Sequence, residues 1–287
     1  MTILTENYTL NNGVKIPKLG FGTWLIGNDQ AAKAVQQAAQ VGYRHFDTAQ
    51  AYGNEEGVGA GLKATGLKRA ELFVTTKVQA EFKDYLTAKK SVDGSLQKLG
   101  LDYVDLLLIH APEPWAEFHG ENHYLEENVE VWRAMEEALQ AGKVRAIGVS
   151  NFLQTDLTNI LENGSVKPAV NQLLTHVGHT SFDLLEQAQR NDILVEAYSP
   201  VAHGEILQNE QIKQMAHKYQ VTVPQLAIRY CLELGTLPLP KSANPEHIAN
   251  NADVDFKIAA EDMQVLEKLP QIKDYGNSSD FPVFSGK

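Results

Sequence analysis

The stretch GYRHFDTAQAYGNE, residues 42–55, decides the fold of this chain. A strand flanked by apolar residues runs into Asp47, and Tyr52 follows five residues later in a turn. Two strand-like segments downstream also end on a polar residue: LFVTT stops at Lys77, and VDLLLI stops at His110. Strands that carry polar residues at their carboxyl ends are typical of a catalytic site on one face of a parallel (β/α)8 barrel.

Strands and helices alternate along the rest of the chain. The strand-like segments are 17–22, 43–47, 71–77, 104–110, 144–149, 168–172, 193–198 and 237–240. Amphipathic segments that end at a glycine predict helices over 31–40, 128–139, 156–161 and 223–234. Eight strands separated by helices favour a (β/α)8 TIM barrel over an open sheet. We find no linker or repeat, so we expect residues 1–287 to form one barrel domain.

Glycines mark two further features. Residues 8–16 are predicted to form an N-terminal β-hairpin, with Asn12-Gly13 providing the positive φ angles of a tight turn. The segment GVGAG, residues 57–61, superficially resembles a dinucleotide-binding fingerprint. It lacks the G-x-G-x-x-G spacing and follows two glutamates rather than a strand. We interpret it as a packing feature of a helix.

Composition excludes several partners. A formal net charge of −11 disfavours nucleic acid and anionic membranes, because both would repel the chain. Cys231 is the only cysteine, which rules out an intramolecular disulfide and fits a reducing compartment. The N-terminus lacks the pattern of a signal peptide, and no apolar run approaches the roughly 18 residues of a membrane span. We expect a cytoplasmic, monomeric enzyme.

The four polar residues carry a coherent chemistry. Tyrosine has a pKa of about 10, and an adjacent ammonium such as Lys77 would lower that pKa and make Tyr52 a usable proton donor. Asp47 would hold Lys77 in place and keep it charged. A neutral His110 would donate an N–H to a carbonyl oxygen and orient it. Together they protonate and polarise a C=O bond, which is half of a carbonyl reduction; a nicotinamide would supply the hydride.

This pattern resembles the aldo-keto reductase family, from GFGTW at residues 20–24 to Lys241-Ser242. In that family these four positions form the catalytic tetrad, with Tyr52 as the proton donor. The resemblance implies reduction of small aldehydes or ketones by NADPH, with NADH as a possible second cofactor. The sequence looks most similar to the bacterial subgroup of 2,5-diketo-gluconate and methylglyoxal reductases.

The resemblance also implies a set of cofactor contacts near the carboxyl ends of the later strands. The residues are Ser150, Asn151, Gln172, Tyr198, Ser199, Lys241, Ser242, His247 and Asn251. The first three would hold the nicotinamide carboxamide, which needs both donors and acceptors. Tyr198 would stack on the nicotinamide ring, and Ser199 would reach the phosphates. Lys241 and Ser242 lie where the family binds the adenosine phosphate, and His247 replaces an arginine that often clamps it.

The chain departs from the family around its substrate pocket, to which we assign Trp24, Ala111 and Trp115. Ala111 replaces a frequent tryptophan, so we expect a wider pocket unless Trp115 or Tyr124 refills it. The apolar C-terminal segment 281–287 is expected to fold back near the site.

The segment 117–124 contains two extra histidines, His119 and His123. We interpret it as an ordinary loop and expect no metal, because these histidines lack nearby carboxylate or thiolate partners in a convincing arrangement.

Two other classes of function stay open. A non-catalytic regulatory subunit would share the fold, as some relatives serve potassium channels, although the complete tetrad argues against it. A Schiff-base aldolase would use Lys77 as its nucleophile. Turnover of a generic aldehyde tests the first alternative, and borohydride trapping on Lys77 tests the second.

Overall fold

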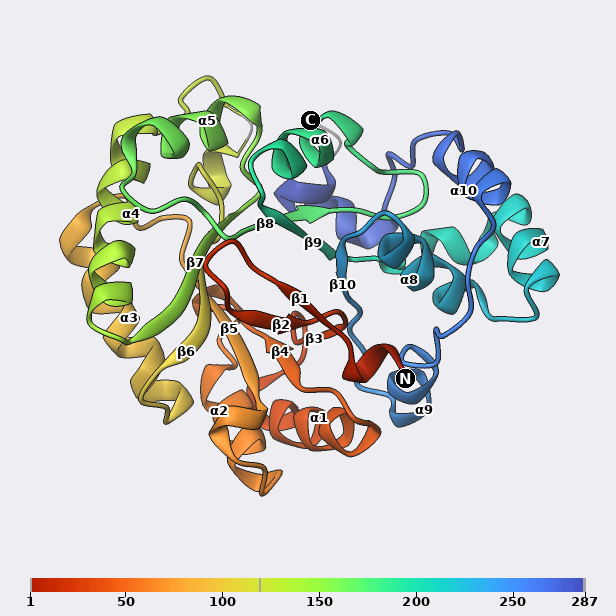
Figure 1. Ribbon diagram of the computed structural model, residues 1–287, viewed down its shortest axis with the longest axis horizontal. Coiled ribbons are helices and arrows are strands. Elements are labelled where there is room, and N and C mark those ends of the chain that lie inside the picture. The colour runs from red at the N-terminus through yellow and green to blue at the C-terminus, as the bar shows by residue number, and fades with distance from the viewer. Residues whose placement is uncertain (1, 119, 286–287) are drawn as a thin grey trace.

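The computed structural model describes residues 2–118 and 120–285, whose centre is a barrel of eight parallel strands (Figure 1). The strands are β3 (Gly20–Gly22), β4 (His45–Asp47), β5 (Phe73–Val78), β6 (Val104–Ile109), β7 (Val144–Ser150), β8 (Val170–Leu174), β9 (Leu194–Tyr198) and β10 (Leu237–Leu239). They pair in the order β10-β9-β8-β7-β6-β5-β4-β3. The predicted (β/α)8 barrel is therefore confirmed.

The barrel closes between its first and last strands. The N–H of Gly22 donates to the carbonyl of Pro240, directly after β10, at 3.0 Å. A Cβ atom at Gly22 would lie 3.2 Å from the carbonyl oxygen of Leu239, tighter than most such contacts. The absence of a side chain at Gly22 thus lets the two strands approach closely enough to close the sheet.

Helices surround the barrel on the outside (Figure 1). They are α1 (Asn28–Val41), α2 (Glu55–Ala64), α3 (Tyr85–Leu99), α4 (Leu125–Gln140), α5 (Gln154–Asn163), α6 (Phe182–Arg190), α7 (Glu210–Lys218), α8 (Val223–Glu233), α9 (Pro245–Asn250) and α10 (Ala260–Glu267). The four predicted helices correspond to α1, α4, α5 and α8. Within residues 2–118 and 120–285, no helix is both long and apolar enough to span a membrane.

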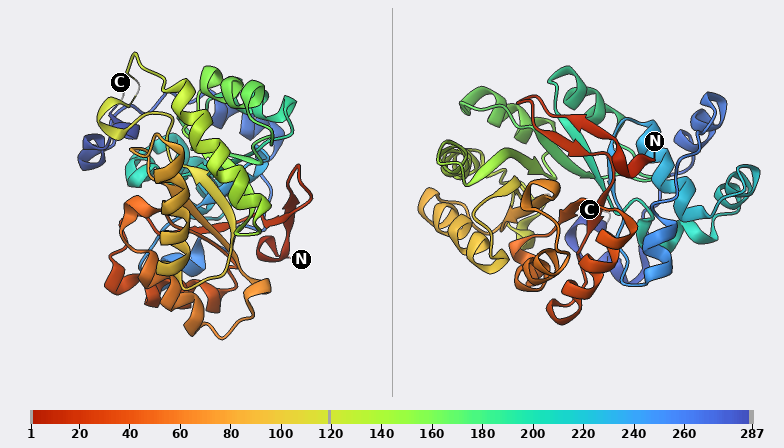
Figure 2. Two further views of the ribbon diagram at one scale, coloured as in Figure 1. Left: turned by 90° about the vertical axis from the view of Figure 1, so that its left-hand side faces the viewer. Right: turned by 60° about the horizontal axis from the view of Figure 1, so that its bottom comes forward.

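The N-terminal hairpin, β1 (Asn7–Thr9) and β2 (Lys15–Pro17), covers the end of the barrel where the strands begin. The side chain of Asn11 donates to the carbonyl of Pro168 at 2.8 Å, and that of Asn12 to the carbonyl of Arg145 at 3.0 Å. The C-terminal segment lies at the opposite end (Figure 2). The hairpin therefore leaves the carboxyl ends of the strands open.

The turn of this hairpin differs from the expectation. Only Gly13 has a positive φ, of 84°, and residues 10–14 all lie between the paired strands. Asn11 and Asn12 are the central residues of a β-turn, because the N–H of Gly13 donates to the carbonyl of Leu10 at 2.8 Å. Gly13 adds a third residue to the loop, which is therefore longer than a two-residue turn.

The glycines of α2 are packing positions, as predicted. A Cβ at Gly57 would lie 2.1 Å from the carbonyl oxygen of Asn28 in α1, and one at Gly59 would lie 2.2 Å from that of Leu99 in α3. Each glycine lets a neighbouring helix approach the α2 backbone closely. This explains the GVGAG segment without a nucleotide.

Candidate active site

Lys77 lies at the centre of the polar residues that the strands bring together. Its ammonium nitrogen donates to Oδ1 of Asp47 at 2.6 Å, to the carbonyl of Thr48 at 3.0 Å and to the hydroxyl of Tyr52 at 3.2 Å. The lysine side chain is fully buried. Because an ammonium has three N–H groups, all of its donors are engaged. The Tyr52 oxygen accepts from Lys77, so its own proton remains available to another acceptor.

The charges of this group are set by burial and by Asp47. Burial is the strongest single influence on Lys77 and disfavours its charged form, but Asp47 and Tyr52 together outweigh burial, so the pKa of Lys77 is raised. Burial also raises the pKa of Tyr52, and the Lys77 ammonium offsets this only in part. The net lowering of the Tyr52 pKa that the sequence suggested is therefore not found. Tyr52 is instead held firmly as a protonated phenol beside a permanent cation.

His110 follows β6 and faces Tyr52 across the site. The centroids of the two rings are 5.4 Å apart, and the ring planes are inclined to each other by 72°. Burial, reinforced by the charge on Lys77, lowers the pKa of His110 well below its ordinary value. The imidazole is thus neutral at physiological pH, as the proposed hydrogen-bond donor to a carbonyl oxygen needs to be.

A series of polar side chains leads from Asp47 into the interior of the barrel. The side-chain nitrogen of Gln172 donates to Oδ2 of Asp47 at 2.9 Å and to Oε2 of Glu196 at 2.7 Å. Oε1 of Glu196 lies 3.8 Å from Nε2 of His45. Burial and the charge of Asp47 raise the pKa of Glu196 to about 8, while burial lowers the pKa of His45 to about 3. At neutral pH both groups are therefore largely uncharged.

Glu196 and His45 were not predicted from the sequence. Both are fully buried members of barrel strands. The strand LVEAY could have indicated Glu196. Because successive side chains of a strand point to opposite faces, Glu196 points to the face opposite that of its two neighbours. A charged residue type in a buried strand is unusual enough to mark a polar network.

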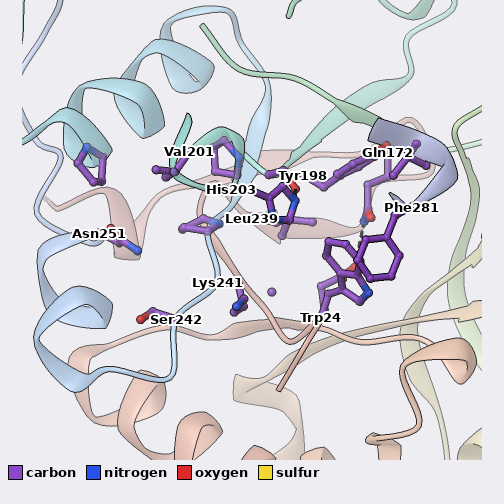
Figure 3. Close-up of a pocket in the computed structure, with 18 of the residues that line it drawn as sticks. Trp24, Gln172, Tyr198, Val201, His203, Leu239, Lys241, Ser242, Asn251 and Phe281 are labelled. Atoms are coloured by element: carbon purple, nitrogen blue, oxygen red, sulfur yellow. Dashed lines mark hydrogen bonds between the residues drawn. The ribbon is translucent and has the colours of Figure 1, made fainter. Parts of the chain in front are cut away.

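A pocket of about 820 Å³ opens at the carboxyl ends of the strands (Figure 3). Fourteen of the sixteen residues predicted from the sequence line it: Trp24, Asp47, Tyr52, His110, Trp115, Ser150, Asn151, Gln172, Tyr198, Ser199, Lys241, Ser242, His247 and Asn251. The other two are Lys77, which lies beneath the floor, and Ala111. In Figure 3 the aromatic side chains of Trp24 and Phe281 stand apart from Ser242 and Asn251. The pocket therefore extends from the tetrad to α9.

Ala111 does not belong to the substrate pocket, contrary to the prediction. It is fully buried, and its carbonyl oxygen accepts a hydrogen bond from Lys83 at 3.0 Å. Trp115 instead lines the pocket and packs edge-on against His110, with centroids 5.0 Å apart. The indole of Trp115 thus fills the region that the alanine was expected to leave open.

The C-terminal segment forms an aromatic wall of the pocket, in agreement with the expectation for this tail. Phe281 packs edge-on against Trp24, with ring centroids 4.9 Å apart, and Phe284 stacks on Trp24, with ring centroids 5.8 Å apart. His203 was not predicted from the sequence. The centroid of its ring lies 4.4 Å from that of Phe284 and 5.3 Å from that of Trp24. The last two residues of the tail, 286 and 287, are outside the described residues.

The residues expected to bind the nicotinamide form one hydrogen-bonded group. Asn151 donates from its side chain to the carbonyl of His110 at 3.0 Å and to the hydroxyl of Ser150 at 3.1 Å, and its Oδ1 accepts from Tyr198 at 2.7 Å. The Ser150 hydroxyl donates to the carbonyl of Gln172 at 3.0 Å. Because both amide hydrogens of Gln172 are also engaged, the free groups on this side are mainly acceptor oxygens. They suit the NH₂ of a carboxamide.

The far end of the pocket carries exposed polar residues. Lys241 and His247 are exposed, and Asn251 is nearly buried at the end of α9. Glu246, which the sequence did not single out, also lines this end and is exposed. A lysine, a hydroxyl and an imidazole fit a phosphate group, whereas the carboxylate of Glu246 opposes one.

His123 has the carboxylate partners that the sequence was thought to lack. Its Nδ1 lies 3.1 Å from Oδ1 of Asp156 and 3.7 Å from Oε1 of Glu113. The expectation failed because Asp156 is distant in sequence and reaches the loop only through the fold. His119 is outside the described residues.

Comparisons with known proteins agree with this geometry. A model of the Aldo/keto reductase family matches residues 18–270. Glyoxal reductase from Bacillus subtilis is 39% identical over 285 residues, covering 99% of each chain. Methylglyoxal reductase DkgA from Escherichia coli O157:H7 is 38% identical over 274 residues, covering 94% of this chain and 96% of the relative.

Solved structures give the same result. An aldo/keto reductase from Brucella melitensis superposes with a TM-score of 0.85 at 39% identity, covering 92% of this chain and 98% of the other. The Bombyx mori aldo-keto reductase in complex with NADP superposes with a TM-score of 0.84 at 33% identity, covering 97% and 98%.

A closed parallel barrel with Asp, Tyr, Lys and His at the carboxyl ends of its strands, together with these matches, shows that the chain belongs to the aldo/keto reductase family. It is accordingly an NAD(P)H-dependent carbonyl reductase.

Proposed function

We propose that this chain reduces small aldehydes and ketones to alcohols with NADPH, using Tyr52 as the proton donor. The observation that supports this most directly is the arrangement of Lys77, which binds the Tyr52 oxygen at 3.2 Å and leaves the phenolic proton free toward the pocket. The names of the similar reductases favour 1,2-dicarbonyl compounds such as glyoxal and methylglyoxal as the first substrates to test.

The protein's own residues would act on the carbonyl oxygen. His110, neutral and beside Tyr52, would donate one ring N–H to that oxygen and orient it. Tyr52 would then transfer its proton to the oxygen, and the fixed charge of Lys77 would stabilise the phenolate that forms. Bound NADPH supplies the hydride that the carbonyl carbon receives.

The alternative of a Schiff-base aldolase is disfavoured by the environment of Lys77. A nucleophilic lysine must be neutral and reachable. Here the ammonium donates to three acceptors, its pKa is raised, and its side chain is fully buried below the pocket. The same residue is well suited to hold a permanent charge beside Tyr52.

For the cofactor, we propose a preference for NADPH over NADH that is weaker than a full phosphate clamp would give. Lys241 provides a point charge and Ser242 a hydroxyl donor, and both line the far end of the pocket. His247 offers no planar, permanently charged fork that binds phosphate at two points. The carboxylate of Glu246 at the same end also opposes the 2′-phosphate. We therefore expect appreciable activity with NADH.

The test is steady-state kinetics with methylglyoxal, glyoxal and a nitrobenzaldehyde, following the loss of NADPH absorbance. Turnover of at least one substrate is expected. Failure with all three would leave the regulatory-subunit alternative standing. In parallel, borohydride is added to enzyme and carbonyl substrate without cofactor, followed by mass spectrometry. A reduced adduct on Lys77 would contradict the proposed role of this lysine.

A further inference from the structure

Asn54 lies two residues after Tyr52 and is fully buried. Its Oδ1 accepts from the hydroxyl of Thr48 at 2.7 Å. Its Nδ2 donates to the carbonyls of Thr23 at 2.9 Å and of Ile26 at 3.0 Å. A primary amide offers two N–H donors and one carbonyl oxygen. Both donors and the oxygen of Asn54 are therefore engaged inside the protein, with the loops that follow β3 and β4.

Capping of α2 does not account for this side chain. Asn54 is the N-cap residue of α2, a position where an asparagine side chain usually accepts from an N–H of the first helical turn. Here the side chain makes no such bond. The N–H of Gly57 donates instead to Oδ1 of Asn28 in α1, at 2.7 Å. The side chain of Asn54 is thus directed to the loops before the helix rather than to the helix itself.

The bond between Asn54 and Thr48 closes the segment 48–54 on itself, and Tyr52 lies within this segment. The carbonyl of Thr48 accepts from Lys77 at 3.0 Å, and Lys77 also donates to the Tyr52 hydroxyl at 3.2 Å. The base of the closed segment is therefore fixed to the same ammonium that binds the phenolic oxygen. Because this segment carries Tyr52, its closure determines where the phenol stands relative to Lys77.

The two bonds from Nδ2 of Asn54 fix a second turn, which carries Trp24. The N–H of Ile26 donates to the carbonyl of Thr23 at 3.1 Å, and Leu25 inside this turn has a φ of 60°. Residues other than glycine rarely adopt such an angle. Leu25 is 55% exposed, so burial of its side chain does little to offset the strain. Strained turns persist where the surrounding structure fixes them, and Asn54 binds both the first and the last carbonyl of this one.

We propose that Asn54 is a positioning residue, which holds the Tyr52 segment and the Trp24 turn in a fixed relation at the pocket. The inference rests on the proposed role of Tyr52 as the proton donor. Tyr52 and Trp24 line the pocket and Asn54 does not, so Asn54 acts through them. A displacement of about 1 Å at a reacting group can cost about 10²-fold in rate. The loss of Asn54 should therefore lower kcat and leave the affinity for NADPH unchanged.

The test measures kcat and KM with methylglyoxal, glyoxal or the nitrobenzaldehyde, whichever the wild type reduces fastest. Each kcat is divided by the number of NADPH-binding sites found by fluorescence titration, so that unfolded protein is not counted. Asn54→Ala should lower kcat per site about 10- to 100-fold and raise KM, because both the Tyr52 segment and the Trp24 turn are released. Thr48→Val should lower kcat alone, because the bonds from Nδ2 to the Trp24 turn remain.

Two further variants separate positioning from general destabilisation. Thr48→Ser keeps the hydroxyl that donates to Asn54, so it should recover most of the kcat that Thr48→Val loses. Asn28→Ala is the matched control, because it removes a side-chain amide that supports the same end of α2 from α1. It should keep the kcat per site of the wild type. An equal loss in Asn28→Ala would mean that Asn54 only stabilises the helix, and would overturn the inference.

A double variant tests whether Asn54 acts through Tyr52. Asn54→Ala added to Tyr52→Phe should lower the remaining kcat by less than about 3-fold, because residues that act as a unit have non-additive effects. Thr48→Val takes the place of Asn54→Ala if the latter does not fold. The full loss in the Tyr52→Phe background, or wild-type kcat per site in both Asn54→Ala and Thr48→Val, would overturn the role of Asn54 alone. An active Tyr52→Phe would overturn the proposed proton donor, and this inference with it.

Discussion

The side-chain nitrogen of Gln172 lies 2.9 Å from Oδ2 of Asp47, while Oδ1 of the same carboxylate accepts from Lys77. Asp47 thus connects the lysine beneath Tyr52 to Gln172 on β8. Because the second amide hydrogen of Gln172 is directed to Glu196, Gln172 can offer the cofactor only its oxygen. The groups that we propose for catalysis and for cofactor binding therefore form one hydrogen-bonded network through Asp47.

The first prediction concerns the proton donor. Tyr52→Phe removes only the phenolic oxygen that Lys77 holds, so kcat should fall about 10²- to 10⁴-fold, the usual share of general acid catalysis. NADPH affinity, measured by fluorescence titration, should stay near that of the wild type. Tyr103→Phe, which changes a tyrosine outside the pocket, should leave kcat unchanged. More than a tenth of the activity left in Tyr52→Phe would exclude the assignment.

The second prediction treats Asp47 and Lys77 as a coupled pair. Lys77→Met leaves the Asp47 carboxylate buried without its cation, and should cost about 3–5 kcal/mol in the free energy of unfolding. Asp47→Asn combined with Lys77→Met removes both charges and should restore part of that loss. Urea unfolding of the wild type, both single variants and the double variant measures the coupling. A double variant no more stable than Lys77→Met would refute it. Both variants that lack Lys77 should lose most of their kcat.

The third prediction uses the raised pKa of Glu196. The folded state keeps this proton up to about pH 8, whereas the unfolded chain releases it near the ordinary glutamate pKa. The unfolding free energy should therefore fall as pH rises from about 5 to about 8, by up to about 1.4 kcal/mol per pH unit. Glu196→Gln removes this contribution, so its stability relative to the wild type should increase with pH.

Urea titrations of both proteins at pH 5, 6, 7 and 8 measure that difference. The opposite contribution of His45 is present in both and cancels. Glu130→Gln, an exposed position on α4, is the control and should run parallel to the wild type. Parallel curves for Glu196→Gln as well would mean that Glu196 is ionised in the folded state.

The fourth prediction concerns the pocket wall. Trp115→Ala should raise kcat/KM for bulky aldehydes relative to methylglyoxal, because the indole packs on His110 inside the pocket. Ala111→Trp should instead lower stability by about 1–3 kcal/mol through overpacking, and reduce turnover of small and large substrates alike. A selective loss for large substrates in Ala111→Trp would restore the sequence-based assignment of Ala111 to the pocket.

The fifth prediction concerns cofactor choice. His247→Arg adds a planar, charged group at the far end of the pocket, which should raise the preference for NADPH over NADH by about 10- to 100-fold. The quantity measured is the ratio of kcat/KM for the two cofactors. His217→Arg makes the same change far from the pocket and should leave the ratio unaltered. An unchanged ratio in His247→Arg would show that this residue does not contact the 2′-phosphate.

Much of the site could be predicted because its positions are local consequences of strand pattern. Apolar runs that end in Asp47, Lys77 and His110 place those residues at the same edge of a parallel sheet. This placement follows from the local pattern of each strand and does not depend on the other segments of the chain. Ala111 was misassigned because it lies two residues beyond the end of β6. There the direction of the side chain depends on the turn that follows and on its contact with Lys83.

The sequence by itself determined the order of strands and helices, the barrel, and most of the residues that line the pocket at the carboxyl ends of the strands. Hydrophobic periodicity and glycine stops act over a few neighbouring residues and can be read directly. Only the tertiary structure decided that Glu196 lies beside His45, that Phe284 covers Trp24, and that Asp156 meets His123. These pairs join distant segments. Closing the barrel places Glu196 of β9 beside His45 of β4 in its interior, and it brings the loops that follow the strands together at one rim.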